Sequence, residues 1–389
     1  MKALQIKPNI YWVGAVDWTC RNFHGYDATR GVTYNAYLII DEKITLIDNV
    51  HHSLTEQMIE YISSIIDPAK IDVIISNHGE PDHSGSLKLV LSYAPNAVVY
   101  ATPNGEKILK AQYGDLKIQT VKNNEPLSLG KRTLRFIHTP MVHWPDNMVT
   151  YDETDKILFS NDAFGQHIAS SERYDKDYPK ETFFYEMKKY YANIILPYSM
   201  QTKKALELVK TLDLEMICPS HGLMITSYKE DVFKLYEQMV NHHKEEKAVI
   251  IFDTMWGSTE KMAVMIAEAF INNNMPVSLF NISNTHFSTL ITEVMEAKYL
   301  VIGSPTLNNG MMPAIASFLH YLKGLKPANL EFISFGSYGW GGQSPDLISE
   351  ELRNMGYKEL ISPLKQYFVP TKANLEQIHA NITQALKNK

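Results

Sequence analysis

The sequence predicts an α/β protein of two domains, a sandwich of two sheets followed by a doubly wound parallel sheet. Strand-like runs of the first half end in histidines and acids, whereas those of the second half alternate regularly with helix-like patterns. Between the halves lies the charged segment "NHHKEEK" (241–247), which is typical of a linker. A chain of 389 residues is also too long for one ordinary core. We therefore expect domains at residues 1–246 and 247–389.

The composition narrows the class of protein. Hydrophobic residues make up 45% and charged residues 21%, as in globular proteins. A formal net charge of −6 argues against a nucleic-acid binder, and no apolar stretch reaches the roughly 20 residues of a membrane helix. The first residues lack the apolar core of a secretory signal, and the only cysteines, Cys20 and Cys218, cannot build a disulfide framework. We expect a cytoplasmic protein that binds neither nucleic acid nor a membrane.

The strand-like runs of the first half are less periodic than those of the second. In chain order they are "NIYWVGA", "NAYLIID", "ITLIDN", "IDVIIS", "AVVYAT", "TLRFIHT" and "ILFSND", with helices between some of them. A sandwich of two sheets presents a site on its edge loops in this way, because the loops carry polar groups that the strands cannot bury.

The segment "NHGEPDHSGS" (77–86) brings four ionisable side chains into six positions directly after an apolar strand. Further nitrogen and oxygen donors stand at later strand ends. The candidate metal ligands are His78, Glu80, Asp82, His83, His143, Asp162 and His221. Seven donors exceed the needs of one tetrahedral zinc and suit two ions that share a carboxylate. Three carboxylates favour a hard, redox-capable ion such as iron, although ligand type leaves zinc open.

Ordinary surface histidines and helix-capping acids are the alternative interpretation of these residues. That interpretation suits a single histidine, but it does not explain a dense cluster together with three later donors at strand ends. By contrast, the pairs His51/His52 and His242/His243 are expected to be solvated.

The second half predicts a parallel sheet with helices on both faces, because strands and helices alternate. The expected strands cover 248–252, 276–282, 298–303, 330–336 and 363–369. The expected helices are "STEKMAVMIAEAFINN", "HFSTLITEVMEA", "PAIASFLHYLKGL", "SPDLISEELRNMG" and "ANLEQIHANITQALKN". Five such units in under 150 residues suit the flavodoxin-like winding, with strand order 2-1-3-4-5.

Ligands of such a sheet bind at the carboxyl ends of the strands. The loops at those ends are "DTMWGSTEKMA", "SPTLNNGMMP" and "GSYGWGGQ". The first offers hydroxyl groups and a helix N-terminus to a phosphate, and the other two suit a planar ring. The candidate cofactor-binding residues are Thr254, Met255, Trp256, Gly257, Ser258, Thr259, Pro305, Thr306, Leu307, Asn308, Asn309, Ser337, Tyr338, Gly339, Trp340, Gly341 and Gly342. Neither a Walker lysine pattern nor a G-x-G-x-x-G after a strand is present.

The spacing H-x-E-x-D-H, followed by a histidine, an aspartate and a histidine, resembles the metallo-β-lactamase fold in its di-iron version, which implies an αββα sandwich for the first domain. Hydrolases of that superfamily usually carry H-x-H-x-D-H, and here Glu80 replaces the middle histidine. The resemblance implies one iron on His78, Glu80 and His143, and the other on Asp82, His83 and His221, with Asp162 bridging. Members of the family differ in whether the residue at the place of His83 reaches the metal.

The order of the domains resembles the A-type flavoproteins, or flavodiiron proteins, of the rubredoxin:oxygen and nitric oxide reductase family. The similar motifs are "HGY" (24–26), "TYNAYL" (33–38), "HWPD" (143–146), "YYANI" (190–194) and "STEKMA" (258–263). The resemblance implies a di-iron domain over 1–246 and an FMN-binding, flavodoxin-like domain over 247–389. In this family, FMN passes electrons to two irons, which reduce O2 to water, NO to N2O, or both.

The resemblance also implies partners. We expect a head-to-tail homodimer, or a dimer of dimers, and an external electron donor, because the sequence has no paired Cys-x-x-Cys motifs of an attached rubredoxin. Rubredoxin is the expected donor and a reduced deazaflavin the alternative. His24, Tyr191 and Trp144 are expected beside the irons, where buried core polar residues are the competing interpretation.

Two other functions stay open at this point. One is a zinc-dependent hydrolase with a regulatory flavin domain, against which Glu80 counts. The other is an electron carrier whose first domain is inert, which the full set of seven donors disfavours. The preference between oxygen and nitric oxide is not predicted.

Overall fold

The computed structural model describes residues 2–388, and its chain divides into two compact units, Met1–Val240 and Asn241–Lys389. Each unit has its own buried hydrophobic core. The division falls a few residues before the expected boundary at 246/247, which lies inside strand β17 (Glu245–Phe252). Within residues 2–388, none of the helices is both long and apolar enough to cross a lipid bilayer.

A seven-stranded mixed sheet forms one layer of the first unit, with the order β1-β2-β7-β8-β9-β10-β11. Its strands are β1 (Leu4–Lys7), β2 (Ile10–Trp12), β7 (Tyr37–Ile39), β8 (Thr45–Ile47), β9 (Val73–Ile75), β10 (Val98–Ala101) and β11 (Ile118–Thr120). The strands from β8 to β11 run parallel. Central strands such as β9, with the sequence "VII", are buried throughout, because layers cover both faces of the sheet.

The second layer is a five-stranded sheet whose strands follow chain order. They are β12 (Pro126–Ser128), β13 (Thr133–His138), β14 (Met148–Asp152), β15 (Ile157–Asn161) and β16 (Met216–Pro219). The first four are antiparallel, and β16 runs parallel to β15. Two short ribbons accompany the sheets: β3 (Ala15–Asp17) with β6 (Val32–Tyr34), and β4 (Asn22–Phe23) with β5 (Tyr26–Asp27).

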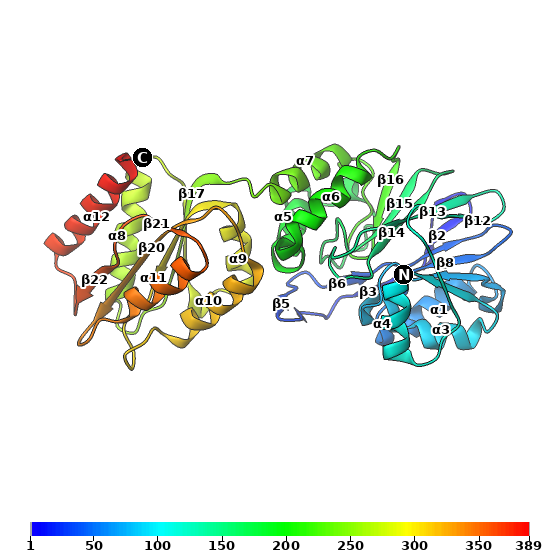
Figure 1. Ribbon diagram of the computed structural model, residues 1–389, viewed down its shortest axis with the longest axis horizontal. Helices are drawn as coiled ribbons and strands as arrows, with labels where there is room; N and C mark the ends of the chain where they lie inside the picture. The colour runs from blue at the N-terminus through cyan, green and yellow to red at the C-terminus, as the bar shows by residue number, and fades with distance from the viewer. Residues whose placement is uncertain (1, 389) are drawn as a thin grey trace. The chain divides into compact units, whose positions relative to one another are not determined.

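Helices cover the outer faces of the two sheets (Figure 1). Helices α1, α3 and α4 lie along the first sheet, and α5, α6 and α7 along the second. The helices are α1 (Thr55–Ser63), α2 (Pro81–Ser84), α3 (Leu87–Tyr93), α4 (Pro103–Tyr113), α5 (Lys180–Tyr190), α6 (Ser199–Val209) and α7 (Lys229–Val240). One core cluster joins buried residues of both sheets, such as Leu46, Ile74, Phe136 and Phe159. The predicted αββα sandwich is confirmed.

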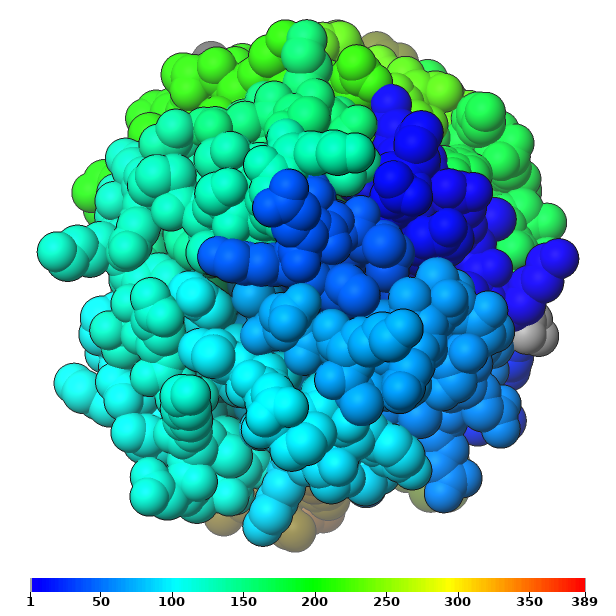
Figure 2. All heavy atoms as spheres, turned by 90° about the vertical axis from the view of Figure 1, so that its right-hand side faces the viewer, coloured from blue at the N-terminus to red at the C-terminus, as the bar shows by residue number. Residues whose placement is uncertain are grey.

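At one end of this unit, segments far apart in the sequence share a surface. Figure 2 shows dark-blue segments near the N-terminus beside blue-green segments of the second sheet. Arg132 donates a hydrogen bond to the carbonyl of Pro8 (2.7 Å), and Asp41 accepts one from the backbone N–H of Lys131 (3.1 Å). These contacts join the edges of the two layers.

The second unit is a parallel sheet of order β18-β17-β19-β20-β21, with β22 also paired to β20. Besides β17, its strands are β18 (Val277–Asn281), β19 (Ala297–Gly303), β20 (Glu331–Tyr338), β21 (Lys358–Glu359) and β22 (Leu364–Tyr367). Numbered within the unit, this order is the predicted 2-1-3-4-5, with the fifth strand split in two. The flavodoxin-like winding is thus confirmed.

The helices of the second unit lie on both faces of its sheet. They are α8 (Ser258–Asn272), α9 (Phe287–Glu296), α10 (Pro313–Leu325), α11 (Ser344–Asn354) and α12 (Lys372–Lys387). Figure 1 shows α8 and α12 together on one face and α9 and α10 on the other. Their apolar stripes supply Met262, Ile266, Phe270 and Ile382 to the core.

Candidate functional site

The seven predicted metal ligands all follow the carboxyl ends of strands. They lie after β9 (His78, Glu80) and in α2 (Asp82, His83), and after β13 (His143), β15 (Asp162) and β16 (His221). Strands β13 and β15 both run antiparallel to β14, and β16 runs parallel to β15, so these three strands end at the same edge of their sheet. Strand β9 brings the other four donors to that edge from the first sheet.

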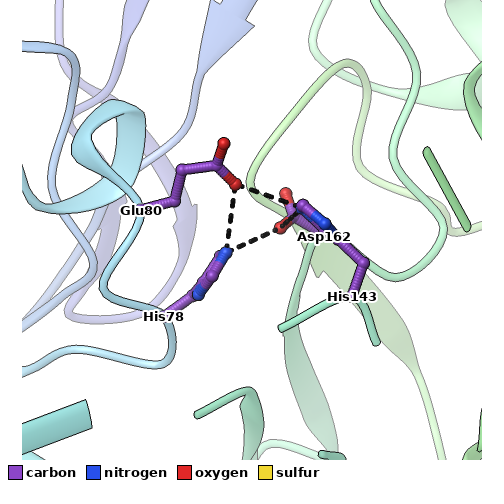
Figure 3. Close-up of side chains that lie close together, drawn as sticks. All are labelled: His78, Glu80, His143 and Asp162. Carbon is purple, nitrogen blue, oxygen red and sulfur yellow. Dashed lines mark hydrogen bonds and ion pairs between the residues drawn. The ribbon is translucent and has the colours of Figure 1, made fainter. Parts of the chain in front are cut away.

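Four donors form a first group (Figure 3). Glu80 Oε2 lies 3.2 Å from His78 Nε2 and 3.1 Å from His143 Nε2. Asp162 Oδ2 lies 3.6 Å from His78 Nε2 and 3.4 Å from His143 Nε2. The donor atoms of the group lie within 4.8 Å of one another, which is the spacing that one coordinated ion needs.

Asp82, His83 and His221 form a second group within the same limit of 4.8 Å. Asp82 Oδ2 lies 3.3 Å from His83 Nε2 and 3.1 Å from His221 Nε2. Asp162 Oδ1 lies 2.9 Å from His83 Nε2 and 3.6 Å from His221 Nε2. Asp162 therefore turns one carboxylate oxygen to each group, as a bridging ligand does.

The burial of these side chains fits metal ions. Glu80 and Asp82 are 8% and 4% exposed, and His78 and His83 are fully buried. Apart from the ion-pair contacts given above, both oxygens of Asp82, both ring nitrogens of His83 and Oδ2 of Asp162 have no hydrogen-bond partner. A buried polar atom without a partner costs about 1–3 kcal/mol. An ion in each group would satisfy the carboxylate oxygens and one of the two His83 nitrogens, and the nitrogen and oxygen donor set suits iron or zinc.

Opposite charges shape the ionisation of the groups. Burial lowers the pKa of His83, but the charges of Asp82 and Asp162 outweigh it and raise this pKa to about 9. Burial raises the pKa of Glu80, but hydrogen bonds with His143, His24 and His78 outweigh burial and hold this pKa well below its usual range. The Glu80 carboxylate is therefore ready as an anionic ligand, and a metal ion would compete with protons for the imidazoles.

Two of the histidines among the metal donors make hydrogen bonds through their second ring nitrogen, Nδ1. His78 Nδ1 lies 3.1 Å from both carboxylate oxygens of Asp146, which also accepts a hydrogen bond from the N–H of Gly79 (2.6 Å). His221 Nδ1 lies 2.7 Å from the carbonyl oxygen of Thr33. Such partners fix the ring so that Nε2 faces the metal. Sequence reasoning missed both, although Asp146 ends the quoted motif "HWPD".

Two of the three residues expected beside the irons do lie there. His24 Nε2 is 3.4 Å from Glu80 Oε1, and the side chain of His24 is 71% exposed. The hydrogen bond with Glu80 raises the pKa of His24. The ring of Trp144 stands edge-on to His78, with centroids 5.0 Å apart.

The expectation for Tyr191 needs correction. Its hydroxyl is paired with Ser199 Oγ (2.8 Å), and its ring packs against Tyr236. The tyrosine at the metal site is its chain neighbour Tyr190, which donates a hydrogen bond to Asp162 Oδ1 (2.9 Å). Tyr190 ends α5 and Tyr191 begins a π-helical turn, so the two rings leave the helix in different directions.

His167 is a further residue that the sequence did not single out. It is fully buried, and its ring centroid lies 5.2 Å from that of His221 and 5.0 Å from that of Tyr190. Burial lowers the pKa of His167 well below its usual value, so its imidazole is neutral.

A cavity of about 510 Å³ lies at the carboxyl ends of β17, β19 and β20 in the second unit. All three predicted loops contribute to it. The predicted residues that line it are Met255, Trp256, Ser258, Pro305, Thr306, Leu307, Asn308, Asn309, Ser337, Tyr338, Gly339 and Trp340. Phe368 and Val369, which follow β22, also line it and were not predicted.

The other five predicted residues are outside the lining, and some of them build the loops instead. Gly257 caps α8 with a φ of 81°, which a side chain would strain. Its N–H donates to Thr254 Oγ1 (3.0 Å). The buried hydroxyl of Thr259 pairs with Ser337 Oγ (2.8 Å). The remaining two are Gly341 and Gly342, both with positive φ.

Comparison with known proteins finds a matching family model in each half of the chain. Residues 32–222 match the model of the ODP family beta lactamase, and residues 250–380 match the flavodoxin model. The rubredoxin-oxygen oxidoreductase of Megalodesulfovibrio gigas is 41% identical over 100% of this chain and 99% of its own. The nitric oxide reductase of Moorella thermoacetica is 41% identical over 90% of this chain and 89% of its own.

A solved structure agrees along the whole chain. The crystal structure of the flavodiiron protein from Giardia intestinalis superposes with a TM-score of 0.96 at 32% identity, covering 100% of this chain and 96% of that one. The two domain matches and the relatives at 41% identity cover both the metal-site loops and the flavin loops. The chain belongs to the flavodiiron protein family.

Proposed function

We propose that this protein is a flavodiiron reductase, which passes electrons from an external donor through FMN to a di-iron centre that reduces O2 to water, NO to N2O, or both. The observation that carries the proposal is Asp162, whose two oxygens face two separate groups of metal donors. The names of two relatives, a rubredoxin-oxygen oxidoreductase and a nitric oxide reductase, support the two substrates.

The residues present fit both cofactors. His78, Glu80 and His143 would hold one iron, and Asp82, His83 and His221 the other, with Asp162 between them. When bound, the flavin supplies electrons and the irons supply a redox site for a diatomic gas. The N-terminal turn of α8, which begins at Ser258, and the loop before it would hold the FMN phosphate at the positive end of the helix. We assign the di-iron site to residues 1–246 and the FMN site to residues 247–389.

The chain itself contributes hydrogen bonds around the metals. Tyr190 donates to Asp162, and Asp146 orients His78. His24, at an exposed position, can hold a proton on Nε2 within reach of Glu80. Reduction of oxygen to water consumes four protons with four electrons, so an exposed imidazole at the edge of a buried site is well placed to donate one.

The proposal includes partners and location. Rubredoxin is the proposed donor, as the name of one relative suggests, with a reduced deazaflavin as the alternative. Trp256 and Trp340 line the flavin cavity and are 93% and 80% exposed. Large exposed aromatic groups are typical of interaction sites, which supports a head-to-tail homodimer that covers the flavin. We propose that the dimer works in the cytoplasm.

The test combines cofactor analysis with gas consumption. The purified full-length protein should contain about two irons and one FMN per chain. With chemically reduced rubredoxin under anaerobic conditions, it should consume added O2, NO or both at steady state. An active hydrolase that holds only zinc would support the alternative function. A protein with both cofactors that consumes neither gas would refute the reductase proposal.

A further inference from the structure

A buried carboxylate, Asp48, lies among the loops that carry the metal donors without being one of them. It follows strand β8 and is 2% exposed. Its Oδ1 accepts a hydrogen bond from the backbone N–H of Asn77 (2.8 Å). Its Oδ2 accepts from Asn77 Nδ2 (2.9 Å) and from Asn161 Nδ2 (3.3 Å). Asn77 directly precedes the ligand His78, and Asn161 directly precedes Asp162.

The network continues from Asn161 to the other ligand loops. Asn161 Nδ2 also donates to Ser220 Oγ (3.1 Å), and Ser220 precedes the ligand His221. Asn161 Oδ1 accepts from Asn147 Nδ2 (3.3 Å). Asn147 Oδ1 in turn accepts from the N–H of Trp144 (2.6 Å), the residue after His143. One chain of hydrogen bonds therefore reaches the neighbours of four ligands from both sheets.

The residue after Asp48 reaches the remaining loop. The backbone N–H of Asn49 donates to the carbonyl of the ligand His83 (3.0 Å). The turn at Asp48 has a φ of 55°, a strained conformation for a residue with a side chain. Surrounding structure must hold such a conformation, and here the partners that hold it are the ligand loops.

We propose that Asp48 is the positioning residue of the metal centre, which sets the distance between the ligand loops of the two sheets. The inference rests on the two-metal site proposed above. All three of its partners are N–H donors, and only a carboxylate offers acceptors on both oxygens. An asparagine at this position would turn an NH2 group toward an N–H donor.

The test is Asp48→Asn in the full-length protein, with Asp152→Asn as the matched control. Asp152 is also a buried carboxylate of the first unit, and it accepts hydrogen bonds from the N–H groups of Thr154 (2.9 Å) and Asp155 (3.2 Å). The two variants make the same chemical change, but Asp152 contacts Thr154, Asp155 and Arg132, none of which lies in a ligand loop. Both are compared with wild type after removal of the native metal and loading with Co²⁺.

The measurement is the affinity for Co²⁺ in competition with a chelator, followed by the visible absorption of the bound ion. Asp48→Asn should weaken binding by about tenfold to a hundredfold, the usual effect of removing a partner behind a metal ligand. Asp152→Asn should bind Co²⁺ as wild type does, whatever its loss of thermal stability, and both variants should retain FMN. Equal Co²⁺ affinity in the two variants would overturn the inference.

If Asp48→Asn does not fold, a second variant, Asn147→Ala, tests the same hydrogen-bond network. Asn147 is the network residue that bonds to the loop of His143, a donor of the first group only. Asn147→Ala should therefore loosen the ion held by His78, Glu80 and His143 and spare the other, so that one of two Co²⁺ ions exchanges faster. Equal acceleration of both ions, or of neither, contradicts the inference. Wild-type protein that binds fewer than two Co²⁺ per chain would instead contradict the proposed metal centre.

Discussion

Glu80 is the donor that distinguishes this site from a zinc hydrolase. Its Oε2 lies within 3.2 Å of two imidazole nitrogens, and neighbouring hydrogen bonds hold its pKa below the usual range. It therefore supplies a fixed negative charge to the first ion. A hard anionic donor favours iron, whereas an imidazole in its place suits zinc equally well.

Replacing Glu80 by histidine tests this role. We expect Glu80→His to hold less iron or more zinc and to reduce gases at least about tenfold more slowly, since a charged ligand is lost. FMN should remain at wild-type content because its cavity lies in the other unit. Metal analysis and gas consumption on the same sample provide the measurement. Wild-type iron content together with wild-type turnover would show that Glu80 does not select the metal.

Tyr190 and Tyr191 form a natural pair for a second test. Tyr190→Phe removes a hydrogen bond to the charged Asp162, which contributes about 1.5–3 kcal/mol, and should change the spectrum and reduction potential of the iron centre. Tyr191→Phe removes a hydrogen bond to Ser199 and should change only thermal stability. Electron paramagnetic resonance during a redox titration compares the two. An unchanged centre in Tyr190→Phe would show that this hydroxyl does not act on the metals.

At the scale of elements, the first two residues of α8 have different roles. Ser258 lines the cavity, whereas the Thr259 hydroxyl is buried against Ser337. Ser258→Ala should weaken FMN binding by about tenfold, corresponding to a lost hydrogen bond to a charged phosphate, with little change in stability. Thr259→Val should lower the free energy of unfolding instead. Flavin fluorescence titration and urea unfolding measure the two effects, and the reverse outcome would exchange the roles of the two hydroxyls.

Lys244 joins the start of the second unit to the end of α9. Its Nζ donates to the carbonyl of Met295 (2.7 Å), and burial lowers its pKa to about 7, while Glu296 opposes and Lys247 adds to the shift. In the unfolded chain, a lysine titrates near 10.4. Between about pH 7 and pH 10 the unfolded chain therefore binds more protons than the folded one. Stability contributed by neutral Lys244 rises with pH across this window and is constant below it.

The expected outcome is a free energy of unfolding that rises by at most about 1.4 kcal/mol per pH unit above pH 7 through this one group. Lys244→Met should remove that part of the slope, because methionine does not titrate. Urea unfolding at pH 7, 8 and 9 measures it, with the exposed Lys261→Met as control. Identical slopes in the two variants would contradict the assignment.

For the whole molecule, the two sites belong to two units with separate cores. All seven metal donors lie in the first unit, and the cavity lining lies in the second. Anaerobic removal of iron with a chelator should therefore leave about one FMN per chain, and removal of FMN should leave the metal content unchanged. Absorption spectra and metal analysis before and after each treatment check this. Joint loss of both cofactors would show that the two sites do not hold their cofactors independently.

The sequence by itself determined the fold and the ligand set. Alternating strands and helices predicted the parallel sheet of the second unit, and the confirmed order 2-1-3-4-5 followed from five βα units. The seven donors were visible because each stands at the end of an apolar strand, and the structure brings them together in two groups. Local pattern suffices for such features, since strand ends of one sheet meet at one edge.

The tertiary structure alone decided which groups support those donors. Asp48 lies 29 residues before Asn77 and 113 before Asn161, and the segment "LIDN" reads only as the end of a strand. Tyr190 and Tyr191 are equivalent in sequence, and only the turn of the helix after α5 separates them. Hydrogen bonds between distant residues have no period along the chain. They depend on how the two sheets pack, and packing is a property of the whole fold.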